Sequence, residues 1–273
     1  MADFPSVGQY TIAKAFPSAS SGVSIDPGGS INTKGPYFTV ASGTTFCVNY
    51  LTINKETTLR NQQTLFDISI GAPGSEQVVL GNLHHANGSE TLLAGLYSIP
   101  IPITIPISTR IAARCQSSVA SANTVISLIT FGGGFLSPPA PHFTRTYGAD
   151  PSDSGGTQVD PGAVVGDKGV YSVLSSATVA PINWMALFIG NQANTAPATA
   201  RFRLDISIGN SGSELPIVEN LVFGSIAAAN GIFPGAFSFP VCIPSSVRVS
   251  ARASSTIADA TDRLFDVVAV GIT

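Results

Sequence analysis

The chain has 273 residues and a formal net charge of −3, and only 11% of its residues are charged. Basic and acidic residues are interspersed, which excludes the basic stripe that a nucleic-acid-binding surface needs. The longest apolar run, 99–107, contains three prolines and falls well short of the ~20 residues of a membrane helix. We therefore expect no nucleic-acid or membrane partner, and a sparsely charged surface that suits packing against neighbouring proteins.

The cysteines and the N-terminus indicate the compartment. Cys47, Cys115 and Cys242 are odd in number, and the two halves of the chain hold unequal numbers of them, which argues against a disulfide framework. The first residues have neither the basic start nor the apolar core of a secretion signal. We expect reduced thiols and assembly in a cytoplasm.

Residues 1–19 are predicted to form an N-terminal arm that precedes the repeated part of the chain. The arm carries large apolar side chains at Phe4, Tyr10 and Phe16 among small polar residues. An arm with such side chains is expected to dock on another surface. These three residues are therefore candidate interface residues.

From residue 20 onwards the sequence occurs twice. The stretch FDISIGAPGSE at 66–76 recurs 138 residues later as LDISIGNSGSE. Upstream, Gly-x-x-(Ile/Val)-Asp-Pro-Gly followed by Lys-Gly-x-Tyr begins at Gly22 and again at Gly156. Downstream, Arg110 and Arg114 recur as Arg248 and Arg252. A nearly constant displacement over this length indicates a tandem duplication.

Each copy is predicted to be an antiparallel β-sandwich. Good helix formers never gather with a 3.6-residue period, whereas two-residue alternation recurs beside glycine and proline. In 110–115, for example, Ile111, Ala113 and Cys115 share the face opposite the two arginines. About eight short strands per copy without crossover helices favour a jelly-roll-like sandwich, with an immunoglobulin-like topology as the competitor. The predicted fold class is all-β.

Proline positions place two further elements. Pro100, Pro102 and Pro106 lack the N–H that a central strand donates, so this segment should lie at a sheet edge or in an extended connection. Residues 134–153 are rich in proline and glycine, which predicts an extended, moderately stiff linker. The predicted organisation is an arm (1–19), a first sandwich (20–133), the linker (134–153) and a second sandwich (154–273).

A set of charged residues is repeated in this charge-poor chain. In one interpretation, carboxylates and arginines clamp a sugar or carboxylate ligand in each copy. In the other, which we favour, the charges satisfy each other across strands or fix subunit contacts. The structural or interface candidates are Asp67, Glu76, Arg110 and Arg114, with their counterparts Asp205, Glu214, Arg248 and Arg252.

No catalytic constellation is apparent. His84 and His85 are adjacent, so on an extended chain they point to opposite faces and do not converge on one ion; they are interpreted as loop or subunit-contact residues. The chain lacks a Gly-x-Ser-x-Gly elbow, and the glycines at 132–134 are followed by no Lys-Ser/Thr. We predict a protein that is not an enzyme, with no cofactor, metal site or catalytic residue.

Taken together, the repeated motifs resemble a module of structural proteins of tailed bacteriophages. The resemblance rests on Gly-x-x-(Ile/Val)-Asp-Pro-Gly, Lys-Gly-x-Tyr, Asp-Ile-Ser-Ile-Gly-x-x-Gly-Ser-Glu and Ile-Pro-x-x-x-Arg-x-x-Ala-Arg, and it covers both copies. It implies a β-sandwich exposed on a capsid or tail, and hence location in a virion assembled in the host cytoplasm. It assigns no catalytic residue.

The expected function is that of a capsid cement or decoration protein, which stabilises the head through contacts with the major capsid protein or other virion proteins. Two similar domains per chain in a homotrimer would present six nearly equivalent units, matching the sixfold symmetry of capsid hexamers. The alternatives are a tail or baseplate component and a glycan- or receptor-binding sandwich.

Overall fold

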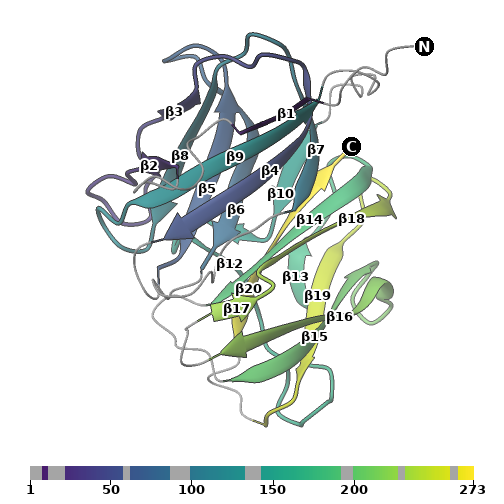
Figure 1. Cartoon of the computed structure of the whole chain (residues 1–273). Coiled ribbons are helices and arrows are strands. Elements are labelled where there is room, and N and C mark those ends of the chain that lie inside the picture. Colours follow the sequence, from purple (N-terminus) through teal and green to yellow (C-terminus); the bar gives the residue numbers. More distant parts are fainter. Residues whose placement is uncertain are drawn as a thin grey trace, which may run out of the picture.

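The computed structural model of the chain describes residues 8–11, 22–57, 62–86, 99–132, 143–191, 199–226, 231–258 and 264–273. Within these ranges the regular structure is entirely β (Figure 1). Phe4 and Phe16 lie outside the described residues, and of Tyr10 only the backbone is described. No helix in the described part of the chain is long and apolar enough to cross a membrane.

The first sandwich is formed by two antiparallel sheets. Its strands are β1 (Gly8–Thr11), β2 (Val23–Ile25), β3 (Phe38–Ala41), β4 (Val48–Thr57), β5 (Thr64–Ile70), β6 (Gln77–His85), β7 (Pro100–Ile105), β8 (Ile111–Ser117) and β9 (Thr124–Gly132). The β4–β9 sheet has the order β1-β9-β4-β7, and β2 also pairs with β9. The β5–β8 sheet has the order β3-β8-β5-β6.

The second sandwich repeats this plan. Its strands are β10 (Thr144–Tyr147), β11 (Ala149–Asp150), β12 (Gly155–Val159), β13 (Ser172–Ser175), β14 (Ile182–Asn191), β15 (Ala200–Ile208), β16 (Leu215–Ile226), β17 (Gly231–Phe233), β18 (Ala236–Ile243), β19 (Val249–Ser255) and β20 (Phe265–Ile272). The β14–β20 sheet has the order β11-β12-β20-β14-β18, with β10 also on β20. The β15–β19 sheet has the order β13-β19-β15-β16-β17.

The strand pairing identifies the jelly roll. In the first sandwich the antiparallel pairs are β2 with β9, β3 with β8, β4 with β7 and β5 with β6. The pairs of the second are β12 with β20, β13 with β19, β14 with β18 and β15 with β16. Pairing the first strand with the last and so on inwards is the jelly-roll arrangement, so the predicted all-β class with jelly-roll-like sandwiches is confirmed.

The structure differs from the predicted arm and linker. β1 pairs with β9 at the place where β10 pairs with β20: Gly8 lies opposite Gly132, and Arg145 lies opposite Gly271. A strand of each sandwich therefore lies within the segments 1–19 and 134–153 that the sequence left outside the repeat. The sequence does not show this correspondence because a four-residue edge strand is fixed by backbone hydrogen bonds, which many side chains permit.

Alternation along the strands builds the cores, as predicted. Ile111, Ala113 and Cys115 are fully buried between the sheets of the first sandwich, whereas Arg114 is partly exposed. In the second sandwich Phe202, Phe223 and Phe265 pack together with ring centroids 4.9 to 5.3 Å apart. The proline-rich strand β7 ends the β4–β9 sheet, which confirms its predicted edge position.

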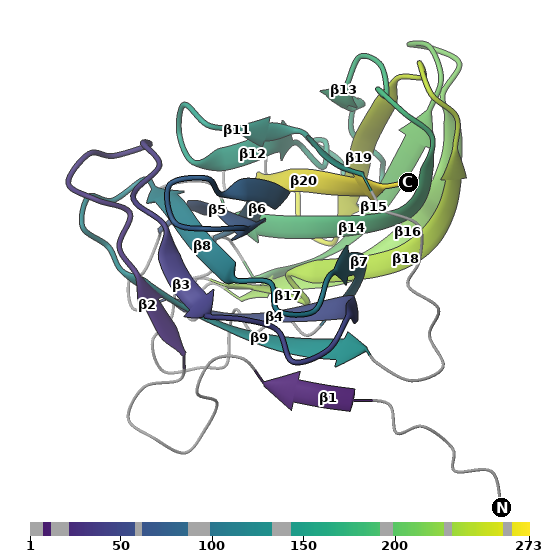
Figure 2. The ribbon, with the colours of Figure 1, turned by 90° about the horizontal axis from the view of Figure 1, so that it is seen from above.

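The two sandwiches pack closely against each other. The outer face of the β14–β20 sheet lies against β6, and the apolar cluster around Leu80 and Leu83 continues into Phe188, Val268 and Val270. Figure 2 shows β6 beside β20 and β14. The hydroxyls of Thr144 and Thr146 in β10 donate to carbonyl groups of β6. The contact covers the edge of β6 that would otherwise be open to another strand.

Candidate functional site

Asp67 is the centre of a buried charge cluster in the first sandwich. Its Oδ1 accepts hydrogen bonds from Nζ of Lys34 at 2.8 Å and from the backbone N–H of Asn82 at 2.9 Å. Its Oδ2 accepts one from Nε of Arg114 at 2.8 Å. The Arg114 guanidinium also lies over the ring of Tyr37, 4.6 Å from its centroid. Two cations and one backbone donor therefore satisfy the carboxylate.

The second sandwich repeats this cluster around Asp205. Lys168 donates to Oδ1 at 2.6 Å, the Asn220 N–H donates to the same atom at 2.9 Å, and Nε of Arg252 donates to Oδ2 at 3.2 Å. The Arg252 guanidinium lies 4.5 Å from the centroid of the Tyr171 ring. The two sites contain the same residue types in the same roles.

Local backbone geometry assembles these clusters. Asn82 and Asn220 have φ of 53° and 54°, a conformation that asparagine tolerates better than most residues. Each lies where the pairing of its hairpin shifts register, in a bulge that turns the backbone N–H towards the aspartate. A Cβ on Gly35 would lie 2.5 Å from the carbonyl oxygen of Asp26, so a glycine is needed to bring the preceding lysine into the cluster.

A second repeated pair closes the hairpin between β5 and β6 and its counterpart. Arg110 donates from one guanidinium nitrogen to Oε1 of Glu76 at 2.9 Å and to the Gly71 carbonyl at 3.0 Å. Oε2 of Glu76 accepts the Gly74 N–H at 2.9 Å. Arg248 and Glu214 make the equivalent contacts. The motif Gly-x-x-Gly-Ser-Glu is therefore a turn closed by its own glutamate.

The environment of these groups shifts their pKa values. Desolvation lowers the pKa of Lys34, although the Asp67 charge opposes it. Desolvation alone would raise the pKa of Asp205, but the hydrogen bonds from Lys168 and Asn220 outweigh it and lower the pKa. For Glu76, desolvation is likewise outweighed by hydrogen bonds from its own and neighbouring backbone N–H groups and from Arg110, and the pKa is lowered. The lowered pKa values of Asp205 and Glu76 favour the charged form of these two carboxylates.

All eight charged candidates from the sequence therefore pair inside their own sandwich, and no carboxylate and arginine among them are left to clamp a ligand together. Lys34 and Lys168, which complete the aspartate clusters, are not among the predicted site residues. The available signal was the repeated Lys-Gly-x-Tyr motif, which was recognised only as part of the repeat.

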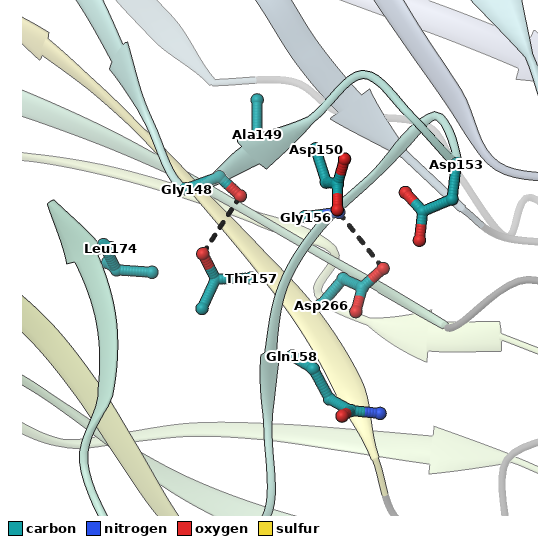
Figure 3. Close-up of a pocket in the computed structure, with 9 residues that line it drawn as sticks. All are labelled: Gly148, Ala149, Asp150, Asp153, Gly156, Thr157, Gln158, Leu174 and Asp266. Atoms are coloured by element: carbon teal, nitrogen blue, oxygen red, sulfur yellow. Dashed lines mark hydrogen bonds between the residues drawn. The ribbon is translucent and has the colours of Figure 1, made fainter. Parts of the chain in front are cut away.

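A polar pocket of about 510 Å³ lies beside β11, β12 and β20 of the second sandwich (Figure 3). Its walls include the carboxyl groups of Asp150, Asp153 and Asp266. Asp266 is only 2% exposed. Its Oδ2 accepts hydrogen bonds from the Gly156 N–H at 3.1 Å and from Nε2 of Gln63, in the first sandwich, at 2.6 Å. The pocket thus adjoins the contact between the sandwiches.

Burial and like charge both act on this pocket. Desolvation, with a contribution from the charge of Asp153, raises the pKa of Asp266 to about 7. Desolvation also raises the pKa of Asp153, and the charge of Asp150 adds to that rise. The described residues contain no group of histidine, cysteine or acidic side chains arranged to hold a metal ion. With its pKa raised to about 7, Asp266 exchanges its proton near neutral pH.

The paired histidines are not loop residues, contrary to expectation. His84 and His85 lie in β6 and are fully buried. A Cβ on Gly190 of β14 would lie 2.6 Å from Cε1 of His84, so the ring packs directly on the second sandwich. The three cysteines are free thiols; Cys115 is buried and Cys242 is exposed.

Exposed apolar side chains are concentrated on the second sandwich, around β13 and the loops that flank it. Val173 is 47% exposed and Val179 is 70% exposed. The registers of β13 and β3 align Val173 with Thr39. Thr178 and Thr44 make equivalent hydrogen bonds to the carbonyls of Pro244 and Pro106, which aligns the next residues, Val179 and Thr45. The members of this valine face, all 47 to 79% exposed, are Val164, Val165, Val170, Val173 and Val179.

Comparison with known proteins gives similarity of fold alone. No family model matches the chain. No curated protein matches it. Among solved structures, it is similar to PNGase F, a glycosylasparaginase from Flavobacterium meningosepticum, at a TM-score of 0.37 and 9% identity, over 98% of this chain and 95% of that one.

Two further solved structures are also similar over nearly the whole chain. The major capsid protein P2 of bacteriophage PM2 is similar at a TM-score of 0.36 and 8% identity, over 97% of this chain and 98% of that one. The tandem CBM22-1-CBM22-2 domain of Xyn10C from Paenibacillus barcinonensis is similar at a TM-score of 0.28 and 10% identity, over 100% of this chain and 94% of that one. These similarities concern β-sandwich architecture, which hosts many functions.

Proposed function

We propose that this chain is a non-enzymatic structural protein of a bacteriophage particle, of the cement or decoration kind that binds across neighbouring capsid subunits. The observation that carries the proposal is the valine face, in which Val164, Val173 and Val179 take the places of Ser30, Thr39 and Thr45 in the first sandwich, whereas Val165 corresponds to Ile31, itself 57% exposed. We infer that these exposed valines, which lie close together along the chain, are buried in contact with another protein. The resemblance of the repeated motifs to phage structural modules supports the virion as the place of that contact.

The charge clusters fit this role. Because the repeated carboxylates pair with cations of their own sandwich, they fix the strands and contribute a rigid scaffold instead of a reactive site. A rigid scaffold lowers the entropy lost when a protein binds a lattice of capsid subunits. Burial of the valines would then raise the free energy needed to remove a subunit under internal pressure or heat.

The proposal is tested by binding to capsids of the phage that encodes the chain, after they have been stripped of this protein. Wild-type protein should sediment with the capsids and raise their temperature of disruption. Val179→Asp should weaken binding by at least tenfold, because it places a charge in the buried contact. Thr45→Asp, at the corresponding position of the first sandwich, is the matched control and should bind as wild type does.

Two other functions are separate outcomes of this experiment. Protein found at the tail of intact virions, with no binding to stripped heads, would indicate a tail or baseplate component. A glycan-array signal that Asp153→Asn abolishes and Val179→Asp leaves unchanged would indicate a glycan-binding module that uses the polar pocket. Absence of the chain from purified virions would overturn the structural role.

A further inference from the structure

The contact between the two sandwiches is a junction between one surface of the first repeat and a different surface of the second. The first repeat contributes β6 and the neighbouring part of β5, where Leu65 and His84 lie opposite each other and are fully buried. The second repeat contributes the outer face of the β14–β20 sheet, with Phe188 opposite Val268 and Ala186 opposite Val270. Since each repeat has a version of both surfaces, one of each remains outside this junction.

The unused counterpart of the β6 surface is β16 in the second sandwich. Arg203 and Val222 lie opposite each other there, in the register that Leu65 and His84 occupy in the first sandwich. Val222 is 59% exposed, and Leu215 and Ile226 at the two ends of β16 are 64% and 45% exposed. In the described residues, β17 pairs only with the last part of β16, 224–226.

The unused counterpart of the receiving face is the outer face of the β4–β9 sheet. Thr52 lies opposite Ile129 and Tyr50 lies opposite Phe131, in the register of the Phe188 and Ala186 pairs. Tyr50, Ile129 and Phe131 are half-buried and belong to neither apolar core. The face presents two aromatic rings and an aliphatic side chain away from its own sandwich.

We propose that copies of this chain associate head to tail, with β16 of one copy seated on the outer β4–β9 face of the next, as β6 is seated on the β14–β20 face within each chain. The inference rests on the proposed structural role, for which it names a second copy of the chain as a partner. Figure 1 shows β16 at the lower end of the molecule and β4 and β9 in its upper half, so the two surfaces lie apart and both can be engaged at once.

The side chains on the two surfaces suit each other. Val222 of β16, which is 59% exposed, would meet Tyr50, Ile129 and Phe131. The position of buried Leu65 is taken by exposed Arg203, whose guanidinium can stack on an aromatic ring of the receiving face. With an arginine in place of a leucine, the contact between chains buries less apolar surface than the contact within the chain. We therefore expect association that is reversible and depends on concentration.

Because the two surfaces differ, the association is heterologous: it gives a ring if the rotation between neighbours closes and a filament if it does not. A closed ring of three copies would contain six sandwiches, each in contact with the next through a version of the same junction. Analytical ultracentrifugation of the full chain should therefore detect species that are multiples of 28.0 kDa and increase with protein concentration.

Two single substitutions block opposite ends of the proposed contact. Val222→Glu places a charge on β16 and leaves the receiving face intact, whereas Ile129→Lys changes the receiving face and leaves β16 intact. Each variant alone should sediment as a monomer. An equimolar mixture should form a one-to-one dimer, because one functional copy of each surface is then present. Ile31→Glu, at an apolar residue that is 57% exposed and lies on neither surface, is the matched control and should assemble as wild type does.

Three results would overturn the inference. They are a monomeric wild-type chain at all concentrations tested, a mixture of the two variants that stays monomeric, and a dimer of Ile129→Lys alone, which would indicate β16 pairing with β16. If circular dichroism shows that Ile129→Lys is unfolded, Tyr50→Lys changes the same face. Failure here leaves capsid binding of the monomer unaffected, and absence from virions leaves self-association unaffected, so this inference and the proposed function fail separately.

Discussion

Nε2 of Gln63 in the first sandwich lies 2.6 Å from Oδ2 of Asp266 in the second, and both side chains are almost completely buried. The same Gln63 amide nitrogen donates to the carbonyl oxygen of Asn191 at 2.9 Å. One amide therefore links two strands of the second sandwich to the first. Because the pKa of Asp266 is raised to about 7, this link contains a group that titrates near neutral pH.

The stability of the protein should fall as the pH rises from about 4 to about 7. In that range Asp266 is protonated in the folded state and ionised in the unfolded state, so folding takes up a proton. The loss is at most about 4 kcal/mol for a shift of about three units. In urea denaturation, Asp266→Asn should be much less dependent on pH over this range and more stable than wild type at pH 8.

Asp167→Asn, in an exposed loop, is the control for that experiment. It should retain the pH dependence of the wild-type chain. An Asp266→Asn variant whose stability declines between pH 4 and 7 as steeply as that of wild type would show that Asp266 is not the responsible group.

Removal of either central aspartate should destabilise the protein to a similar extent. Asp67→Asn and Asp205→Asn each leave a lysine and an arginine without their carboxylate. We expect a loss of about 2 to 3 kcal/mol, below the full cost of breaking a buried pair because the cations are partly exposed. Chemical denaturation monitored by the fluorescence of Trp184 measures this loss.

Arg145→Gln is the control for the aspartate variants. The Arg145 side chain is exposed, and the hydrogen bond shown for it goes to the neighbouring Thr144 carbonyl. It should change stability by less than about 0.5 kcal/mol. An aspartate variant as stable as this control would contradict a structural role for the cluster.

The glutamates that close the hairpins should stabilise the protein at neutral pH and lose this effect in acid. The pKa of Glu214 is lowered from 4.5, so its contribution is present above the ordinary carboxyl pKa and is lost as the pH falls through the lowered value. Glu214→Gln should therefore lower the melting temperature at pH 7 and have little effect near pH 2. Glu219→Gln, on exposed β16, should change the melting temperature little at either pH.

The glycine after each cluster lysine should not tolerate a side chain. A Cβ on Gly169 would lie 2.1 Å from the carbonyl oxygen of Asp160, so Gly169→Ala must displace the loop that carries Lys168. We expect a loss of roughly 1 to 3 kcal/mol. Gly29→Ala is the control, because a Cβ there meets nothing within 4 Å. Equal melting temperatures of the two variants would contradict this account.

Local patterns in the sequence were sufficient for the strands and for part of the charge clusters. Alternation along 110–115 identified which side chains face the core, and the prolines of β7 identified an edge strand. The charged residues stand out as a set because they recur at a constant displacement in the second half of the chain. The sequence did not identify Lys34 as the partner of Asp67. These residues are 33 positions apart, and their contact depends on which segments become neighbours in the fold.

The sequence by itself determined that the chain is all-β and that motifs of its first half recur in its second, since alternation, turn residues and repetition are properties of short stretches. Only the tertiary structure decided that β1 and β10 occupy matching places, that His84 is buried between the sandwiches, and that the pKa of Asp266 is raised to about 7. The matching strands depend on pairing with a distant strand of the same sandwich. The other two features arise where one sandwich packs on the other, and burial at that contact depends on distant residues that no local pattern specifies.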